Sequence, residues 1–204
     1  RLVLDVWDLE GGDTVYVDTG YYEIGSNTII ELSDSDAGRA GDMVSIVGSS
    51  SSNGVSLTWI EAVPAEHLIK LAGSNLRLGN FRLVGAGMES SGTNIFLYGI
   101  SLTNNAYVTL GGYNTSVSNV LLAGGRMQTL GELQDLDRIT VQSGLITLRG
   151  RDVTMRNSLV YGTQSVAATV GGTNINLINN TMMGNPTAVR VDGVNAVINL
   201  RNNI

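Results

Sequence analysis

The chain has 204 residues, of which 43 % are hydrophobic and only 15 % charged, so it has ample material for one buried core. Its net charge is −6 and it has no basic run, so nothing in it favours a nucleic-acid partner. No apolar run approaches the ~18 residues that span a bilayer, and the absence of cysteine excludes disulfides and thiolate metal sites.

The composition favours short β-strands over helices. The chain contains 26 glycines and only two prolines, and Val, Ile, Leu, Thr, Ser and Asn dominate the rest. Glycine and asparagine suit tight turns, whereas β-branched residues suit the half-buried surface of a strand. The sequence therefore predicts an all-β protein with many turns.

The first third of the chain shows alternating apolar segments at irregular intervals. The stretch that ends in "VWDLE" precedes the first of them, and we expect residues 1–12 to cap an open end of the fold. Within residues 13–73, the segments at 14–17, 28–32 and 43–48 predict the three strands of a first turn. The segments at 55–60 and 67–73 predict strands of a second turn.

Residues 74–204 repeat one unit. A small or polar residue, often Asn, precedes two alternating apolar residues, and glycine follows soon after, as in "NFRLVGAG" and "NVLLAGG". Two further alternating segments complete each unit. The first paired positions are separated by 19 to 23 residues and fall at Phe81, Ile100, Val120, Ile139, Leu159, Thr181 and Ile204.

Three short strands in about 20 residues describe one rung of a parallel β-helix. Rungs stack at ~4.8 Å, so inward Val, Ile and Leu side chains form ladders. The recurring Asn tolerates a left-handed turn, and its amide can hydrogen-bond to the Asn one rung away. We predict one domain over residues 1–204 with roughly ten rungs.

A family resemblance supports this architecture. The run "GGDTVYVDTGYYEI", followed by "NTIIEL" and "GDMVSIVG", resembles the opening of right-handed parallel β-helix proteins of the pectate-lyase-like superfamily. The segments "INLINNTMMGN" and "AVINLRNNI" are similar to the Asn-rich rungs of the same proteins. The resemblance covers nearly the whole chain and implies an all-β fold with a single right-handed parallel β-helix.

The resemblance says little about activity. The superfamily includes pectate lyases, polygalacturonases, alginate epimerases and lyases, phage tailspikes and non-enzymatic surface modules. A polygalacturonase would carry N-T-D, D-D, G-H-G and R-I-K elements on consecutive rungs, and an epimerase a D-P-H signature. None of these motifs occurs in the sequence.

An acidic excursion provides one candidate site. The segment "ELSDSDAGRAGD" (31–42) contains Asp34, Asp36 and Asp42, and carboxylates two residues apart can wrap a hard cation such as Ca²⁺. The bidentate glutamate of a full calcium loop does not follow. The alternative is a solvated acidic turn capped by aspartate, and no other cofactor is predicted.

A concentration of charge provides the second candidate. Carboxylates beside arginines on adjoining rungs could hold an acidic sugar and remove its C5 proton. The alternative is an outward ion-pair network that solubilises a flat sheet. Besides Glu132, this stretch contains Asp135, Asp137, Arg138, Arg149, Arg151, Asp152 and Arg156.

The tyrosines provide the third candidate, because exposed rings on a β-helix face can stack on sugars. The alternative is that they are packed in turns or over an open end. The candidates are Tyr98, Tyr107, Tyr113 and Tyr161.

We expect a secreted or cell-surface structural β-helix module, bacterial in type, that contacts a polysaccharide or cell-surface glycan and is flanked by other domains. The first alternative is a polysaccharide lyase or hydrolase acting on acidic glycans. The second is a phage-tailspike-like receptor-binding module, which would form a stable trimer.

Overall fold

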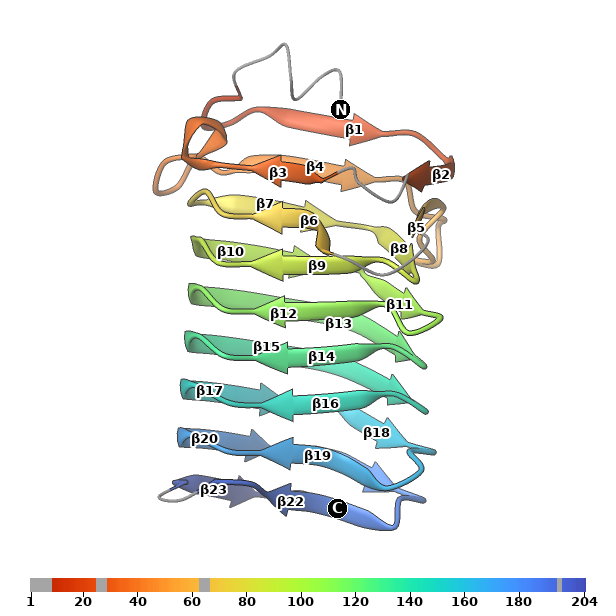
Figure 1. Cartoon of the computed structure of the whole chain (residues 1–204), viewed down its shortest axis with the longest axis vertical. Helices are drawn as coiled ribbons and strands as arrows, with labels where there is room; N and C mark the ends of the chain where they lie inside the picture. Colours follow the sequence, from red (N-terminus) through yellow and green to blue (C-terminus); the bar gives the residue numbers. More distant parts are fainter. Residues whose placement is uncertain (1–8, 25–28, 63–66, 194–195) are drawn as a thin grey trace.

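The computed structural model describes residues 9–24, 29–62, 67–193 and 196–204, which form a parallel β-solenoid of about seven turns. Figure 1 shows the turns stacked along the long axis, from β1 at one end to β22 and β23 at the other. Among the described residues, no helix is long and apolar enough to cross a membrane. The predicted cap falls mostly on residues 1–8, which lie outside the described residues.

The strands build three faces, which we call the first, second and third face in the order in which the chain visits them. The first face contains β1 (Thr14–Val17), β4 (Val44–Gly48), β7 (Leu76–Gly79), β10 (Thr93–Tyr98), the start of β13 (Tyr113–Ala123), the start of β15 (Glu132–Gln142), β17 (Arg151–Arg156), β20 (Thr173–Ile178) and β23 (Ile198–Arg201).

The second face follows directly from the first. It contains β2 (Gly20–Ile24), β5 (Thr58–Ala62), β8 (Phe81–Val84), β11 (Ser101–Thr103), the ends of β13 and β15, β18 (Leu159–Tyr161) and β21 (Thr181–Met183). The third face is a separate eight-stranded sheet made of β3 (Ile30–Leu32), β6 (His67–Leu71), β9 (Gly87–Ser90), β12 (Tyr107–Leu110), β14 (Arg126–Thr129), β16 (Leu145–Leu148), β19 (Val166–Val170) and β22 (Thr187–Val191).

Single left-handed residues make the bend between the first and second faces. The bend falls at Asn80, Gly99, Asn119, Arg138 and Asn157, and each of these residues has a positive φ between 52° and 62°. Asparagine and glycine adopt this conformation at low cost. β13 and β15 continue through the bend, which joins the two faces into one 15-stranded sheet.

The prediction of roughly ten rungs is too high. The third face has eight strands and therefore seven steps between turns. The reason lies in the first turns, which are longer than the repeat. Thr14 pairs with Ser45 and Val44 with Leu76, so these two turns consume 31 and 32 residues. The sequence predicted that the strand at 43–48 closes the first turn. The structure shows instead that β4, at 44–48, begins the second turn.

Inward side chains form apolar ladders along the solenoid. On the second face, one ladder runs through Leu83, Leu102, Leu122, Val141 and Val160, which pair in register and are fully buried. Burying one such side chain stabilises the fold by about 1.5–3 kcal/mol relative to leaving it exposed. Because no turn buries its apolar face alone, each turn depends on its neighbours.

The neighbouring inward ladder changes from apolar to polar. Phe81, Ile100, Val120 and Ile139 are buried as predicted. The positions that continue the register are then Ser158, Asn180 and Asn203, one residue before the predicted Leu159, Thr181 and Ile204. The apolar pattern ends here because Ser158, Asn180 and Asn203 take the inward positions, where their side chains hydrogen-bond to backbone groups.

The Asn180 side chain provides hydrogen-bond partners for the buried backbone groups beside this polar ladder. Its Nδ2 donates to the Met155 carbonyl at 3.0 Å, and its Oδ1 accepts from the Ser158 amide at 3.0 Å. The next turn repeats the arrangement, with Asn203 Oδ1 accepting from the Asn180 amide at 3.0 Å. Buried polar groups with partners of this kind fix the register between turns.

The predicted amide ladders between turns are confirmed at the outer corners. Asn94 Nδ2 donates to Asn75 Oδ1 at 3.0 Å, and Asn114 Nδ2 donates to Asn94 Oδ1 at 2.6 Å. All three residues have a positive φ. Asparagine therefore serves both the turn conformation and the contact between turns.

Candidate functional site

The corner between the third and first faces is built from glycine. A Cβ added to Gly92, Gly112 or Gly131 would lie closer than 3.0 Å to the backbone oxygen of the glycine one turn earlier. Only a hydrogen fits at these positions, so the three glycines present backbone without side chains. This close approach gives the corner a rigid floor.

A hollow of about 610 Å³ lies over this glycine floor. We call it the corner groove. It is lined by Ser91, Thr93, Gly111, Gly112, Tyr113, Leu130, Gly131, Glu132, Gly150 and Arg151. The wall on the first face is a column of three residues in register, because Tyr113 pairs with Glu132 and Glu132 pairs with Arg151.

The column combines a ring with an ion pair. Tyr113 is 47 % exposed, so one ring surface is open to solvent. Arg151 Nη2 donates to Glu132 Oε1, and this hydrogen bond raises the pKa of Arg151 further above its ordinary value. The pair orients the guanidinium beside the ring, where its remaining N–H groups can donate to a ligand.

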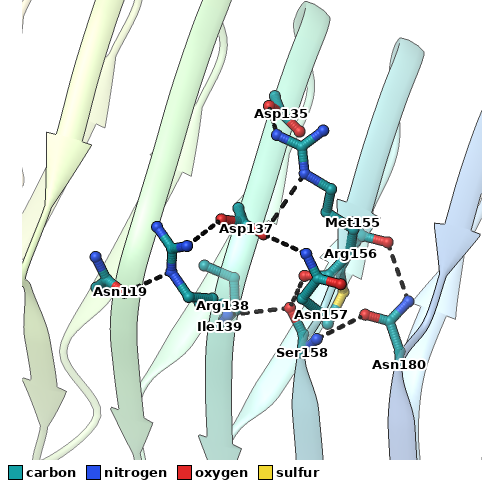
Figure 2. Close-up of polar contacts among 10 residues, drawn as sticks. All are labelled: Asn119, Asp135, Asp137, Arg138, Ile139, Met155, Arg156, Asn157, Ser158 and Asn180. Carbon is teal, nitrogen blue, oxygen red and sulfur yellow. Dashed lines mark hydrogen bonds and ion pairs between the residues drawn. The ribbon is translucent and has the colours of Figure 1, made fainter.

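A second cluster of charges lies further along β15 and β17, on the outward surface of the first face. Figure 2 shows Asp137 surrounded by donors from its own turn and the next. Arg138 Nη1 lies 3.1 Å from Asp137 Oδ2, and Asn157 Nδ2 donates to Asp137 Oδ1 at 2.8 Å. Arg156 donates through Nη2 to Asp135 Oδ2 at 2.7 Å and places Nε 3.5 Å from Asp137 Oδ1.

Asp135 is the least satisfied member of this cluster. Its Oδ1 is buried and has no hydrogen-bond partner among the described residues. Burial raises the pKa of Asp135 above its ordinary value, while the charge of Arg156 lowers it and that of Asp137 raises it. A carboxyl that resists ionisation beside an arginine has the electrostatics of an acid–base group.

The structure divides the predicted charge patch into three groups. Asp135, Asp137, Arg138 and Arg156 form the cluster on the first face. Arg151 and Asp152 lie near the corner groove, with Arg151 Nε 3.8 Å from Asp152 Oδ2. Arg149 follows the third face and pairs with Asp192 at 3.1 Å. Each predicted member therefore has an opposite charge within 4 Å, as in a surface ion-pair network.

The four predicted tyrosines do not form one platform. Tyr98 lies on the first face, where its ring covers Gly79 and stacks under the Arg77 guanidinium at 4.6 Å. Tyr107 lies on the third face over Gly87, and Tyr161 lies half-buried on the second face. Of the four, Tyr113 alone lines the corner groove.

Of the three predicted calcium ligands, Asp36 has a structural role. Asp36 is 8 % exposed and closes a capping box, because its Oδ2 accepts from the Ser33 amide at 3.0 Å. Asp34 lies in the same short 3-10 helix, η1 (Asp34–Asp36), and the backbone of Asp42 pairs with Arg39. Within the described ranges, no group of three His, Cys, Asp or Glu side chains is arranged to hold a metal ion. Asp34, Asp36 and Asp42 are therefore not gathered into one such group.

The spacing of the glycines in the sequence indicates the corner groove, although the groove was not among the predicted sites. Gly92, Gly112, Gly131 and Gly150 recur at nearly the same spacing as the apolar units. Each glycine precedes the first strand of a new turn. Glycine recurring at one corner of a stack indicates close backbone contact, and Tyr113 follows one of these glycines directly.

Comparisons with known proteins are limited to structures. No family model and no curated protein sequence matches the chain. The A-module of the Azotobacter vinelandii mannuronan C-5 epimerase AlgE4 is similar in structure, with a TM-score of 0.52 and 13 % identity over 94 % of this chain and 68 % of that one.

Two further structures are more distant. The A-module of the Azotobacter vinelandii epimerase AlgE6 gives a TM-score of 0.47 and 11 % identity over 95 % of this chain and 91 % of that one. A mannuronic-acid-specific polysaccharide family 6 lyase from human gut microbiota gives 0.30 and 10 % over 95 % and 78 %. The likeness to the AlgE4 A-module confirms the predicted fold, a right-handed parallel β-helix.

Proposed function

We propose that the chain is a structural β-helix module that contacts a polysaccharide through the corner groove without cleaving it. The observation that carries the proposal is the exposed Tyr113 ring beside the Arg151–Glu132 pair over a floor of backbone. A polysaccharide ligand would place the module outside the cell or on its surface.

The chemistry of the groove suits a sugar chain. The open face of Tyr113 can stack on the C–H face of a pyranose ring, as aromatic side chains do with apolar surfaces. Arg151 provides donors and Glu132 provides acceptors for hydroxyl groups. The rigid corner lowers the ordering cost of binding, because the floor contains no rotamers to immobilise.

The pairing of the charges argues for binding over catalysis. Both Asp137 oxygens and Asp135 Oδ2 already contact arginine or asparagine groups. A polyuronate would have to displace these contacts before it reached the carboxylates. The network therefore resembles a solubilising surface more than an open catalytic centre.

The test is affinity electrophoresis through gels that contain alginate, pectate or a neutral glucan. We expect at least one polysaccharide to retard the protein, and Tyr113→Ala and Arg151→Ala to weaken that retardation. Tyr16→Ala is the matched control, because Tyr16 is 80 % exposed on β1 and lies outside the groove. Equal retardation of all three variants and the unaltered chain would exclude the corner groove as the contact site.

The second candidate function is a lyase or epimerase acting on acidic glycans, and Asp135 favours it. Its raised pKa and its position beside Arg156 are features of a proton-transferring group. The measurement is formation of unsaturated uronates, followed by ultraviolet absorbance, and inversion at C5, followed by NMR, on alginate and pectate. Activity that Asp135→Asn abolishes would establish this function in place of the first.

A further inference from the structure

A second exposed aromatic surface lies on the first turns of the second face, away from the corner groove. Tyr21 on β2 and Trp59 on β5 are partners in register on successive turns. They are 56 % and 38 % exposed. Trp59 alternates with the buried residues Thr58 and Ile60, so its ring lies on the outer surface of the sheet.

The next turn holds the tryptophan in place. Arg82 follows Trp59 in the same outward column, and its guanidinium lies 4.3 Å from the centre of the indole ring. A cation over a ring face contributes about 0.5–1 kcal/mol at an exposed site and limits the rotamers of both side chains. Trp59 is therefore oriented before any ligand arrives, which lowers the cost of binding.

Two carboxylates stand in the adjacent outward column. Glu23 and Glu61 are partners in register, two residues beyond Tyr21 and Trp59 along their strands. Within the described part of the chain, no hydrogen bond or ion pair involves either carboxylate. Two carboxylates that lack a partner among the described residues thus lie beside two exposed rings, spaced by one strand separation of ~4.8 Å.

We propose that Tyr21, Trp59, Glu23 and Glu61 form a second glycan-binding site, one that favours neutral over acidic sugars. The rings would stack on the apolar faces of successive pyranoses, and the carboxylates would accept hydrogen bonds from hydroxyl groups. The same two negative charges repel uronates, so the chemistry favours neutral sugars over acidic ones. We call this surface the aromatic platform.

The aromatic platform goes beyond the groove proposed above and stands on different residues. It occupies the first two turns of the second face, whereas the groove lies at the corner of the third and first faces. A chain with two sites on different faces can hold two glycan strands at once. Its avidity for a mixed polysaccharide would then exceed the affinity of either site.

The experiment uses the fluorescence of Trp59. Trp7 is the other of the chain's two tryptophans, so Trp7→Phe leaves Trp59 as the sole indole emitter. This full-length variant is titrated with cellohexaose and hexagalacturonate. We expect cellohexaose to shift the emission to shorter wavelength, and Tyr21→Ala or Glu61→Gln to weaken its binding by about threefold to tenfold.

The controls separate the two sites. Tyr113→Ala removes the groove ring and should leave the cellohexaose titration unchanged. Loss of the titration in Tyr113→Ala would assign the ligand to the groove and overturn the proposal. It would also be overturned if cellohexaose caused no shift or if hexagalacturonate bound as tightly. The outcome of gel retardation by the groove variants does not affect this test.

Discussion

The glycine corner offers a sharp test of how the turns are stacked. In Gly112→Ala, the new Cβ would lie closer than 3.0 Å to the backbone oxygen of Gly92. That oxygen accepts the Tyr113 amide at 3.1 Å, so it cannot move away without loss of a hydrogen bond between turns. The neighbouring Gly111 lies in the same turn, but its Cβ would lie 3.4 Å from the Ser90 oxygen, at ordinary van der Waals contact.

The expected cost follows from this geometry. Overpacking against a fixed neighbour costs about 1–3 kcal/mol, and weakening the hydrogen bond adds about 1 kcal/mol. We therefore expect Gly112→Ala to lower the free energy of unfolding by about 3 kcal/mol, which corresponds to a Tm lower by about 6–12 °C for a chain of this size. Gly111→Ala should stay within about 1 kcal/mol of the unaltered chain.

Urea unfolding followed by circular dichroism measures both variants. The comparison is internal, because both substitutions add one methyl group at adjacent positions. If the two variants unfolded at the same urea concentration, the close backbone contact at the corner would be wrong. The inference that the groove has a rigid floor would then also be wrong.

Three further changes test the polar networks. Asn180→Ala should lower the free energy of unfolding by about 2–4 kcal/mol, because it leaves the buried Met155 carbonyl and Ser158 amide without hydrogen-bond partners. Asn202→Ala removes one exposed hydrogen bond between turns and should lower the free energy of unfolding by less than about 1 kcal/mol in the same urea titration. Asp135→Asn should change stability at neutral pH by less than about 1 kcal/mol. Folding raises the pKa of the Asp135 carboxyl, so its contribution to stability is present at low pH and is lost as pH rises through the raised pKa. The free energy of unfolding of Asp135→Asn should therefore depend less on pH across this acidic range than that of the unaltered chain. Arg156→Ala leaves two carboxylates without their shared cation, so its destabilisation should be largest at neutral pH and should shrink in acid, unlike that of the exposed Arg126→Ala.

The fold could be predicted because its determinants are local and repeated. Alternating Val, Ile and Leu at spacings near 20 residues specify strands that must stack, and Asn at the bends specifies the left-handed corner. The number of turns could not be predicted because residues 13–73 contain long excursions between strands. The polar ladder at Ser158 and Asn180 also broke the apolar pattern, since buried amides are visible only once their backbone partners are placed.

The site could be predicted only in its ingredients. Tyr113, Arg151 and the charges around Asp137 were identified from residue type and density. Which of them meet depends on the register between turns, and a shift of one residue reverses a side chain from the surface to the core. Thus Tyr98, Tyr107 and Tyr161 were indistinguishable from Tyr113 in sequence, although they lie on three different faces.

The central claim is that the chain binds a polysaccharide at the corner groove and leaves it intact. The most direct measurement combines retardation in an alginate, pectate or glucan gel with analysis of the recovered polysaccharide by ultraviolet absorbance and NMR. We expect retardation that Tyr113→Ala weakens, with no unsaturated uronate and no inversion at C5. Product formation that disappears in Asp135→Asn would contradict it and show that the charge cluster is catalytic.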